Sequence, residues 1–269
     1  MAKQKKPSQA KRADKYVLYQ LSVQAPGEEI DFIDEVYRDL RGKKAQILRE
    51  DFCGTALTAC EWVKRRKSNR AVGVDLDPEV LAWGQTHNLD ALKPSQKERI
   101  TLAESDVMTV KANISDIVLA MNFSYWILKE RVLLLKYFKS VYKSLTKDGV
   151  FFLDAFGGYE AFQELKEKRK VNGFTYVWHQ DSYDPISGNM SCHIEFRFPD
   201  KSRIKNAFEY HWRLWTLPEI RGLLTEAGFQ QPIIYWEACD KHGEGNGEFE
   251  PVTHGEADPG WLVYLVAEK

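Results

Sequence analysis

In the first half of the chain, acidic residues stand at or just after the ends of three apolar runs, where a ligand site could form. Residues 50–56 read Glu-Asp-Phe-Cys-Gly-Thr-Ala after an apolar run, Asp75 ends a second apolar run 25 positions beyond Glu50, and Asp106 follows a third run. A glycine such as Gly54 lets the backbone approach a ligand closely. A carboxylate at the place of Asp75 accepts hydrogen bonds from ribose hydroxyls. These residue types therefore indicate a nucleoside-type ligand.

The same acids have structural interpretations, which stay open at this point. Asp75 and Asp77 precede Pro78, which can begin a helix, so either acid could cap that helix. Asp106 could accept a hydrogen bond from an adenine amino group while the backbone N–H of Val107 donates to the ring. It could equally form a turn with its own backbone.

Alternating strands and helices must position these acids. Apolar runs predict strands and helical stripes predict helices, and their alternation indicates βαβ units with a parallel sheet. The expected strands are 46–50, 71–75, 100–103, 116–121, 150–154, 233–236 and 261–266, and the expected helices include 14–24, 55–67, 78–90, 132–145 and 216–228. Right-handed crossovers then favour a doubly wound α/β sheet, whose ligands bind at the carboxyl ends of the strands.

The pattern changes after residue 173. Segments 174–178, 190–198 and 208–214 alternate with period two and place aromatic residues on one side, which predicts an antiparallel meander. This aromatic side must be buried, either on the body of the protein as a lid or against a second copy of the chain in a homodimer. We therefore expect a basic flexible tail over 1–15, an α/β domain over 16–173 and 214–269, and an inserted lid over 174–213.

Bulk composition excludes several classes of protein. The formal net charge is −1, so the whole molecule does not attract polyanions. The four cysteines are scattered with no C-x-x-C pair, which disfavours a disulfide framework or a zinc site and fits a reducing compartment. The basic start has no apolar segment behind it, and no later stretch is long enough to span a membrane. We expect a cytoplasmic protein.

Together these residues resemble the class I S-adenosylmethionine-dependent methyltransferases. Residues 50–56 match the family's first motif, with Cys53-Gly54-Thr55 at its centre, and residues 147–151 match its turn into the fifth strand. The resemblance covers about residues 45–156 and 216–269. It implies S-adenosylmethionine as cofactor and no metal. The cofactor-binding residues that it implies are Glu50, Phe52, Cys53, Gly54, Thr55, Asp75, Leu76, Asp106, Val107 and Asn122. The insertion resembles that of small-molecule methyltransferases acting on amines and glycine.

One departure from the family pattern concerns the loop itself. Phe52 and Ala56 stand where the family usually has glycine. We expect either a different path for the loop or a cofactor covered by the Phe52 ring. The missing glycines argue more strongly against a dehydrogenase. Such an enzyme binds a dinucleotide, which needs G-x-G-x-x-G to seat its pyrophosphate.

Methyl transfer requires a general base only if the acceptor arrives protonated. The candidates are Tyr19, Tyr125 and His211, with Tyr159 and Glu237 as further groups expected to face the crevice. We expect a small-molecule acceptor.

Two other functions remain open. A nucleic-acid methyltransferase would use the basic start and the cluster 64–67 as phosphate contacts, although no Asn-Pro-Pro-Tyr-type motif is present to hold a flipped base. A non-catalytic S-adenosylmethionine-binding protein is the other alternative.

Overall fold

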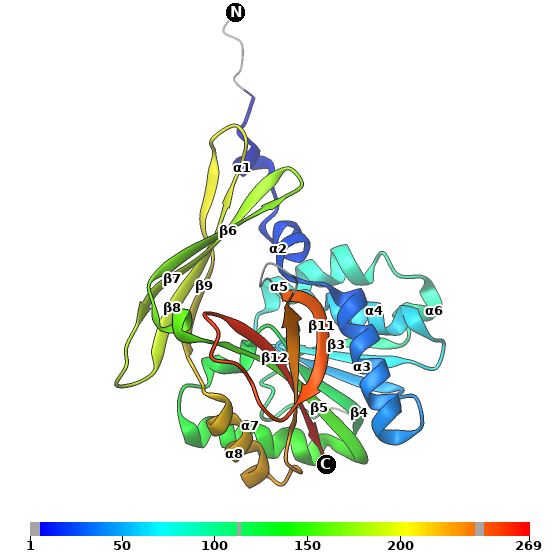
Figure 1. Ribbon diagram of the computed structural model, residues 1–269. Coiled ribbons are helices and arrows are strands. Elements are labelled where there is room, and N and C mark those ends of the chain that lie inside the picture. Colours follow the sequence, from blue (N-terminus) through cyan, green and yellow to red (C-terminus); the bar gives the residue numbers. More distant parts are fainter. Residues whose placement is uncertain (1–5, 112–113, 240–244) are drawn as a thin grey trace, which may run out of the picture. The chain divides into compact units, whose positions relative to one another are not determined.

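The computed structural model describes residues 6–111, 114–239 and 245–269, and the chain divides into two compact units (Figure 1). The α/β unit comprises Pro26–Ala161 and Trp215–Lys269. The insertion unit comprises the described part of Met1–Ala25 together with Phe162–Leu214. These bounds differ from the division expected from sequence, because the N-terminal helices and the segment from Phe162 group with the meander.

The α/β unit is built on an eight-stranded sheet with the order β11-β10-β12-β5-β4-β1-β2-β3. Its strands are β1 (Ile47–Asp51), β2 (Arg70–Asp75), β3 (Ile100–Glu104), β4 (Ser115–Ala120), β5 (Leu145–Gly157), β10 (Ile233–Cys239), β11 (Gly245–Val252) and β12 (Trp261–Glu268). Strands β1 to β5 pair in parallel, whereas β12 is antiparallel to both β5 and β10. The doubly wound α/β prediction is confirmed. From β1 the strand order runs through β2 and β3 to one edge of the sheet, and with β4 it continues on the other side of β1. Such sheets bind ligands at this point of reversal.

Helices cover both faces of this sheet. They are α3 (Pro26–Arg41), α4 (Leu57–Arg65), α5 (Pro78–Gly84), α6 (Pro94–Lys97), α7 (Arg131–Ser144) and α8 (Leu217–Ala227), and a π-helical turn, Gln85–Leu89, continues α5. Phe152 contacts Phe32 of α3, whereas its neighbour Phe151 contacts Tyr137 and Phe138 of α7. Because successive strand residues point to opposite faces, α3 and α7 lie on opposite sides of the sheet.

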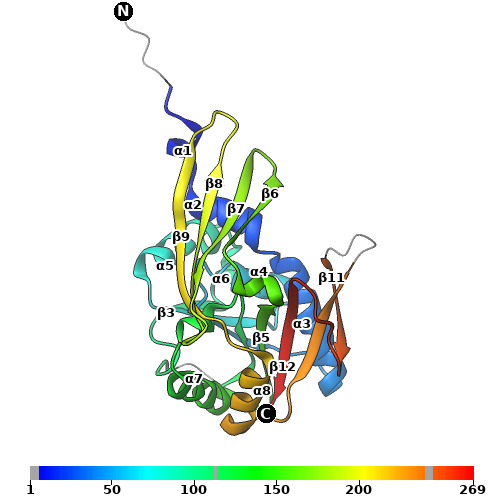
Figure 2. The same ribbon diagram turned by 60° about the vertical axis from the view of Figure 1, so that its left-hand side comes forward.

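The insertion unit is a four-stranded antiparallel sheet with the order β6-β7-β8-β9 (Figure 2). Its strands are β6 (Leu165–Val171), β7 (Phe174–Tyr183), β8 (Asn189–Arg197) and β9 (Arg203–Arg213), and its helices are α1 (Gln9–Arg12) and α2 (Lys15–Val23). Leu18 and Tyr19 of α2 pack on the aromatic side of the sheet, and the rings of Tyr19 and Phe208 lie 4.8 Å apart. Helix α2 of the same chain therefore covers the aromatic side of the sheet, and the burial of this side does not require a second copy.

Three features differ from the sequence expectations. The expected tail over 1–15 contains helix α1, whose Gln9 N–H donates to Asp200 Oδ2 at 2.8 Å. Strand β6 precedes the expected meander. Strand β11 lies between the expected strands 233–236 and 261–266, where the sequence predicts no strand. Within the described ranges, every helix is too short or too polar to cross a lipid bilayer.

Candidate functional site

The loop after β1 has a left-handed backbone at alternate positions. Phe52, Gly54 and Ala56 have φ angles of 55°, 53° and 55°. A residue with a Cβ in this conformation costs roughly 1–2 kcal/mol, so the surrounding structure must hold the loop in place. The loop thus has a glycine-type backbone at the two positions where glycine is missing. The Phe52 ring packs edge-to-face on Tyr137, with the ring centroids 5.5 Å apart.

Hydrogen bonds fix this loop against the neighbouring strand. Cys53 N–H donates to the Val74 carbonyl at 2.9 Å, and Ala56 N–H donates to the Cys53 carbonyl at 2.8 Å. The Cys53 side chain is buried, as is Thr55. The Thr55 carbonyl accepts from the Asn88 amide at 2.9 Å. These contacts hold the predicted ligand loop directly before helix α4.

Asp75 connects the end of β2 to the same loop. Its Oδ2 accepts from Gly54 N–H at 2.7 Å, and its Oδ1 accepts from Asp77 N–H at 3.0 Å. The side chain is half-buried, and an ionised carboxylate offers about four lone-pair sites, so Asp75 keeps acceptor capacity for a ligand. Asp77 is the cap of α5, accepting from Glu79 N–H, as the capping interpretation predicts. Leu76 between them is 63% exposed.

Asp106 forms a turn after β3. Its Oδ1 accepts from Met108 N–H at 2.8 Å, which is the local contact that the turn interpretation describes. Val107 is buried. The preceding Ser105 N–H donates to the Asp75 carbonyl at 2.9 Å, so this turn is joined to the end of β2. The adenine contacts of Asp106 and Val107 stay a prediction.

Asp154 was not recognised in the sequence, yet it organises the loop after β4. Asn122 N–H donates to its Oδ2 at 2.7 Å and Phe123 N–H donates to its Oδ1 at 2.8 Å. Asn122 and Phe123 both have a φ of 56°, so this loop is a second left-handed segment at the same edge of the sheet. A buried carboxylate that accepts two backbone N–H groups holds a strained loop in one conformation.

Buried carboxyl groups gather behind both loops. Glu50 Oε2 accepts from Ala59 N–H in the first turn of α4 at 2.8 Å, and burial raises the pKa of Glu50 to about 8. Burial likewise raises the pKa of Asp154 to about 7. Charge repulsion from Glu29 of α3, which accepts from the Thr58 hydroxyl at 3.2 Å, contributes to both of these pKa shifts. This arrangement favours a cationic ligand, because a nearby positive charge relieves the repulsion.

A buried ion pair lies at the end of β1. Arg49 and Asp51 are each 1% exposed, with Arg49 Nη2 2.7 Å from Asp51 Oδ2. The Tyr137 hydroxyl of α7 donates to the same oxygen at 2.9 Å. This contact ties the strand that carries the candidate site to the helix layer on one face of the sheet.

The candidate general bases are divided between the two units. Tyr125 is fully buried and its hydroxyl donates to the Asp154 carbonyl at 2.8 Å, so the expectation that it faces a crevice is wrong. Tyr19 and His211 belong to the insertion unit, where His211 Nδ1 lies 3.2 Å from the Ser191 hydroxyl. In the α/β unit Tyr159 is exposed, and Glu237 accepts from Gly247 N–H at 3.1 Å.

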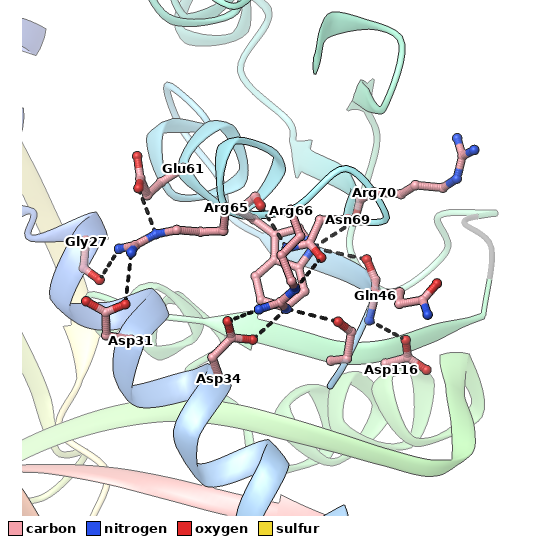
Figure 3. A network of polar contacts seen from close by, with 12 residues as sticks. Gly27, Asp31, Asp34, Gln46, Glu61, Arg65, Arg66, Asn69, Arg70 and Asp116 are labelled. Carbon is pink, nitrogen blue, oxygen red and sulfur yellow. Dashed lines mark hydrogen bonds and ion pairs between the residues drawn. The ribbon is translucent and has the colours of Figure 1, made fainter. Parts of the chain in front are cut away.

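The two arginines of the basic cluster 64–67, at the end of α4, are engaged in contacts within the fold (Figure 3). Arg65 pairs with Asp31 at 3.0 Å, and the Arg66 guanidinium binds both carboxylate oxygens of Asp34. Arginines that are neutralised in this way contribute little to phosphate binding. The arrangement disfavours the use of this cluster as a nucleic-acid contact.

Known structures share this fold along nearly the whole chain. An S-adenosylmethionine-dependent methyltransferase from Clostridium acetobutylicum is 18% identical, with a TM-score of 0.68 and coverage of 94% of this chain and 96% of that chain. An amino pentose methyltransferase from Micromonospora echinaspora, in a structure with S-adenosylmethionine bound, is 15% identical, with a TM-score of 0.65 and coverage of 94% and 95%.

A sugar N-methyltransferase from Streptoalloteichus sp. is 15% identical, with a TM-score of 0.62 and coverage of 100% of this chain and 98% of that chain. The sequence matches no protein-family model and no curated protein. The chain has the fold of S-adenosylmethionine-dependent methyltransferases.

Proposed function

We propose that this chain binds S-adenosylmethionine at the loops that follow β1, β2 and β4, and transfers its methyl group to an amine of a small, sugar-like acceptor. The observation that carries the proposal is the position of Asp75, at the end of β2 and hydrogen-bonded to Gly54. The neighbours of known structure that act on an amino pentose and on a sugar nitrogen support the acceptor class.

Each part of the cofactor has a matching group in this assignment. Asp75 accepts from the ribose hydroxyls, while Asp106 and Val107 face the adenine. The methionyl part lies along residues 52–55 at the start of α4, whose positive dipole end suits its carboxylate. Asn122 lies beside the methyl group. The sulfonium and ammonium charges are balanced by Glu29, Glu50 and Asp154.

Bound S-adenosylmethionine would supply an activated methyl group for transfer to the acceptor nitrogen. The chain's own contribution is orientation and the exclusion of water. Asp154 holds the loop of Asn122 and Phe123 in one conformation, and is therefore a positioning residue. Tyr19 and His211 stay the candidate bases for an acceptor that arrives protonated.

Product analysis tests the reaction. The purified chain is incubated with S-adenosylmethionine carrying a deuterated methyl group and a panel of amino sugars, their hydroxyl counterparts and total RNA. We expect mass spectrometry to find the label on an amino sugar, and not on its hydroxyl counterpart. Cofactor binding without labelled product would favour a non-catalytic binding protein, and label on RNA alone would favour a nucleic-acid methyltransferase.

Cofactor affinity is expected to depend on pH through Glu50 and Asp154. Both pKa values, about 8 and about 7, lie above those of the unfolded chain. Their contribution to stability is therefore complete below about pH 4, and is lost as the pH rises through about 7 and 8. The same ionisation strengthens the attraction for a cation, so affinity for S-adenosylmethionine should rise on the order of tenfold from about pH 6 to about pH 8.5.

The matched ligand for this experiment is S-adenosylhomocysteine, which lacks the sulfonium charge. Calorimetric titrations at several pH values should show a smaller rise in its affinity. The variant Asp154→Asn should reduce the rise for S-adenosylmethionine. Equal pH dependence for the two ligands would show that the buried carboxylates do not face the sulfonium.

A further inference from the structure

Two histidines and an aspartate lie together on the insertion sheet, outside the proposed methyl-transfer site. His179 and Asp181 belong to β7 and His193 belongs to the adjacent strand β8. One potential ligand atom from each residue lies within 4.8 Å of the other two. Asp181 Oδ2 is 2.5 Å from His193 Nδ1. Imidazole nitrogens and carboxylates are the donors that first-row divalent metals take in proteins.

A β-bulge brings the third group to this cluster. His179 is directly opposite His193 in the strand pairing, but the register shifts between Gln180 and Ser182. Asp181 is the extra residue, and its carboxylate reaches His193. Regular pairing would place Asp181 opposite Ser191, which precedes His193 by two positions in β8. Bulges commonly re-aim a side chain in this way at functional positions.

His179 is left with unsatisfied hydrogen-bonding capacity. It is 4% exposed, and its Nε2 makes no hydrogen bond to any described residue. Glu195 Oε2 lies 3.3 Å from this nitrogen but without hydrogen-bond geometry, and its two oxygens accept from Arg197 at 2.9 and 3.0 Å. The His179 ring instead stacks on His193, with the centroids 4.0 Å apart. A buried ring nitrogen without a hydrogen-bond partner calls for an explanation, and metal ligation is one.

We propose that His179, Asp181 and His193 bind one divalent metal ion of the zinc class. The ion takes one ring nitrogen from each histidine and one carboxylate oxygen. Where it binds His193 Nδ1, the single N–H proton of the neutral imidazole stands on Nε2, and the contact between Nδ1 and Asp181 is replaced by two bonds to the metal. Metal–ligand distances of about 2.0–2.2 Å require the three groups to turn toward a common point. Water completes the coordination. The site lies within one unit, so the proposal does not depend on methyl transfer.

Zinc titration of the full chain, freed of affinity tags and treated with chelator, tests the proposal. We expect one Zn²⁺ per chain by calorimetry and elemental analysis, and Co²⁺ in its place should give visible absorption bands of a nitrogen–oxygen site. His193→Gln and Asp181→Asn should each weaken Zn²⁺ binding at least tenfold, with circular dichroism confirming that the variants fold. His211→Gln is the matched control, since His211 is an exposed histidine of the same sheet, and should leave the affinity for Zn²⁺ unchanged.

Three results would overturn the proposal. The first is an absence of saturable Zn²⁺ binding, and the second is binding that survives both ligand substitutions. The third is a loss of affinity in His211→Gln equal to that in the ligand variants. If neither ligand variant folds, histidine ring resonances of the unaltered chain decide. Zn²⁺ must then shift the signals of His179 and His193, and unshifted signals overturn the site.

Discussion

Replacing Asp75 by alanine is expected to weaken S-adenosylmethionine binding by about 10- to 100-fold. Hydrogen bonds to a charged group contribute roughly 1.5–3 kcal/mol, and each 1.4 kcal/mol is about tenfold in affinity. The substitution removes the proposed ribose acceptor and also the partner of Gly54 N–H, so the loop after β1 loses one of its anchors to β2. Calorimetric titration of the folded variant measures the effect.

Asp77→Ala provides the matched control two residues away. Asp77 caps α5 through Glu79 N–H, so this variant should lose about 1 kcal/mol of stability while binding the cofactor within about twofold of the unaltered chain. If Asp75→Ala binds as well as Asp77→Ala does, the ribose lies elsewhere. That result would remove the basis for the proposed orientation of the cofactor.

Replacing Asp51 by leucine is expected to reduce the free energy of unfolding by about 3–5 kcal/mol. The substitution leaves the Arg49 guanidinium buried without its counter-charge, and the Tyr137 hydroxyl loses its acceptor. Desolvation of an unpaired charge is the dominant cost. Urea unfolding followed by circular dichroism measures the change, with the midpoint and the slope both recorded.

The triple variant Arg49→Met, Asp51→Leu, Tyr137→Phe separates lost charge pairing from lost packing. It removes every member of the contact. We expect its free energy of unfolding to lie within about 1 kcal/mol of that of the unaltered chain, because apolar groups often replace buried ion pairs without loss of stability. Arg49 Nε and Asp51 Oδ1 already lack partners among the described residues, so the pair is not optimally satisfied. A triple variant as unstable as Asp51→Leu would contradict this reasoning.

The parallel part of the sheet could be predicted from sequence because its strands are buried on both faces. Strand β4 reads Ser-Asp-Ile-Val-Leu-Ala, and most of its residues are buried. An apolar run of this kind has few other structures open to it. The handedness of βαβ crossovers then favoured a doubly wound sheet, whereas the order of the strands came from the structure.

Strands β6 and β11, which both lie at sheet edges, could not be predicted because their sequences lack the apolar alternation of a strand. Strand β6 reads Leu-Lys-Glu-Lys-Arg-Lys-Val, so charges replace the apolar alternation that marks a strand. Edge strands commonly carry charges, which discourage pairing with other chains. Such a strand is held by hydrogen bonds to its neighbouring strand, so its own residues do not indicate a strand.

The site residues that could not be predicted are those whose role depends on which strands are neighbours in the sheet. Asp154 sits inside an apolar run, and its bonds to Asn122 and Phe123 arise only because β5 lies beside β4. A lone acid in a buried strand was the available signal. The backbone at Phe52 could not be predicted either, because a residue with a side chain gives no indication that it adopts a glycine-type conformation.

Titration of S-adenosylmethionine into the folded chain at about pH 8 tests the central claim most directly. The account predicts saturable binding of one molecule per chain, with a dissociation constant in the range of roughly 1 μM to 1 mM that is usual for enzyme substrates. A folded chain that shows no saturable binding at millimolar ligand would contradict it, and only the fold would remain established.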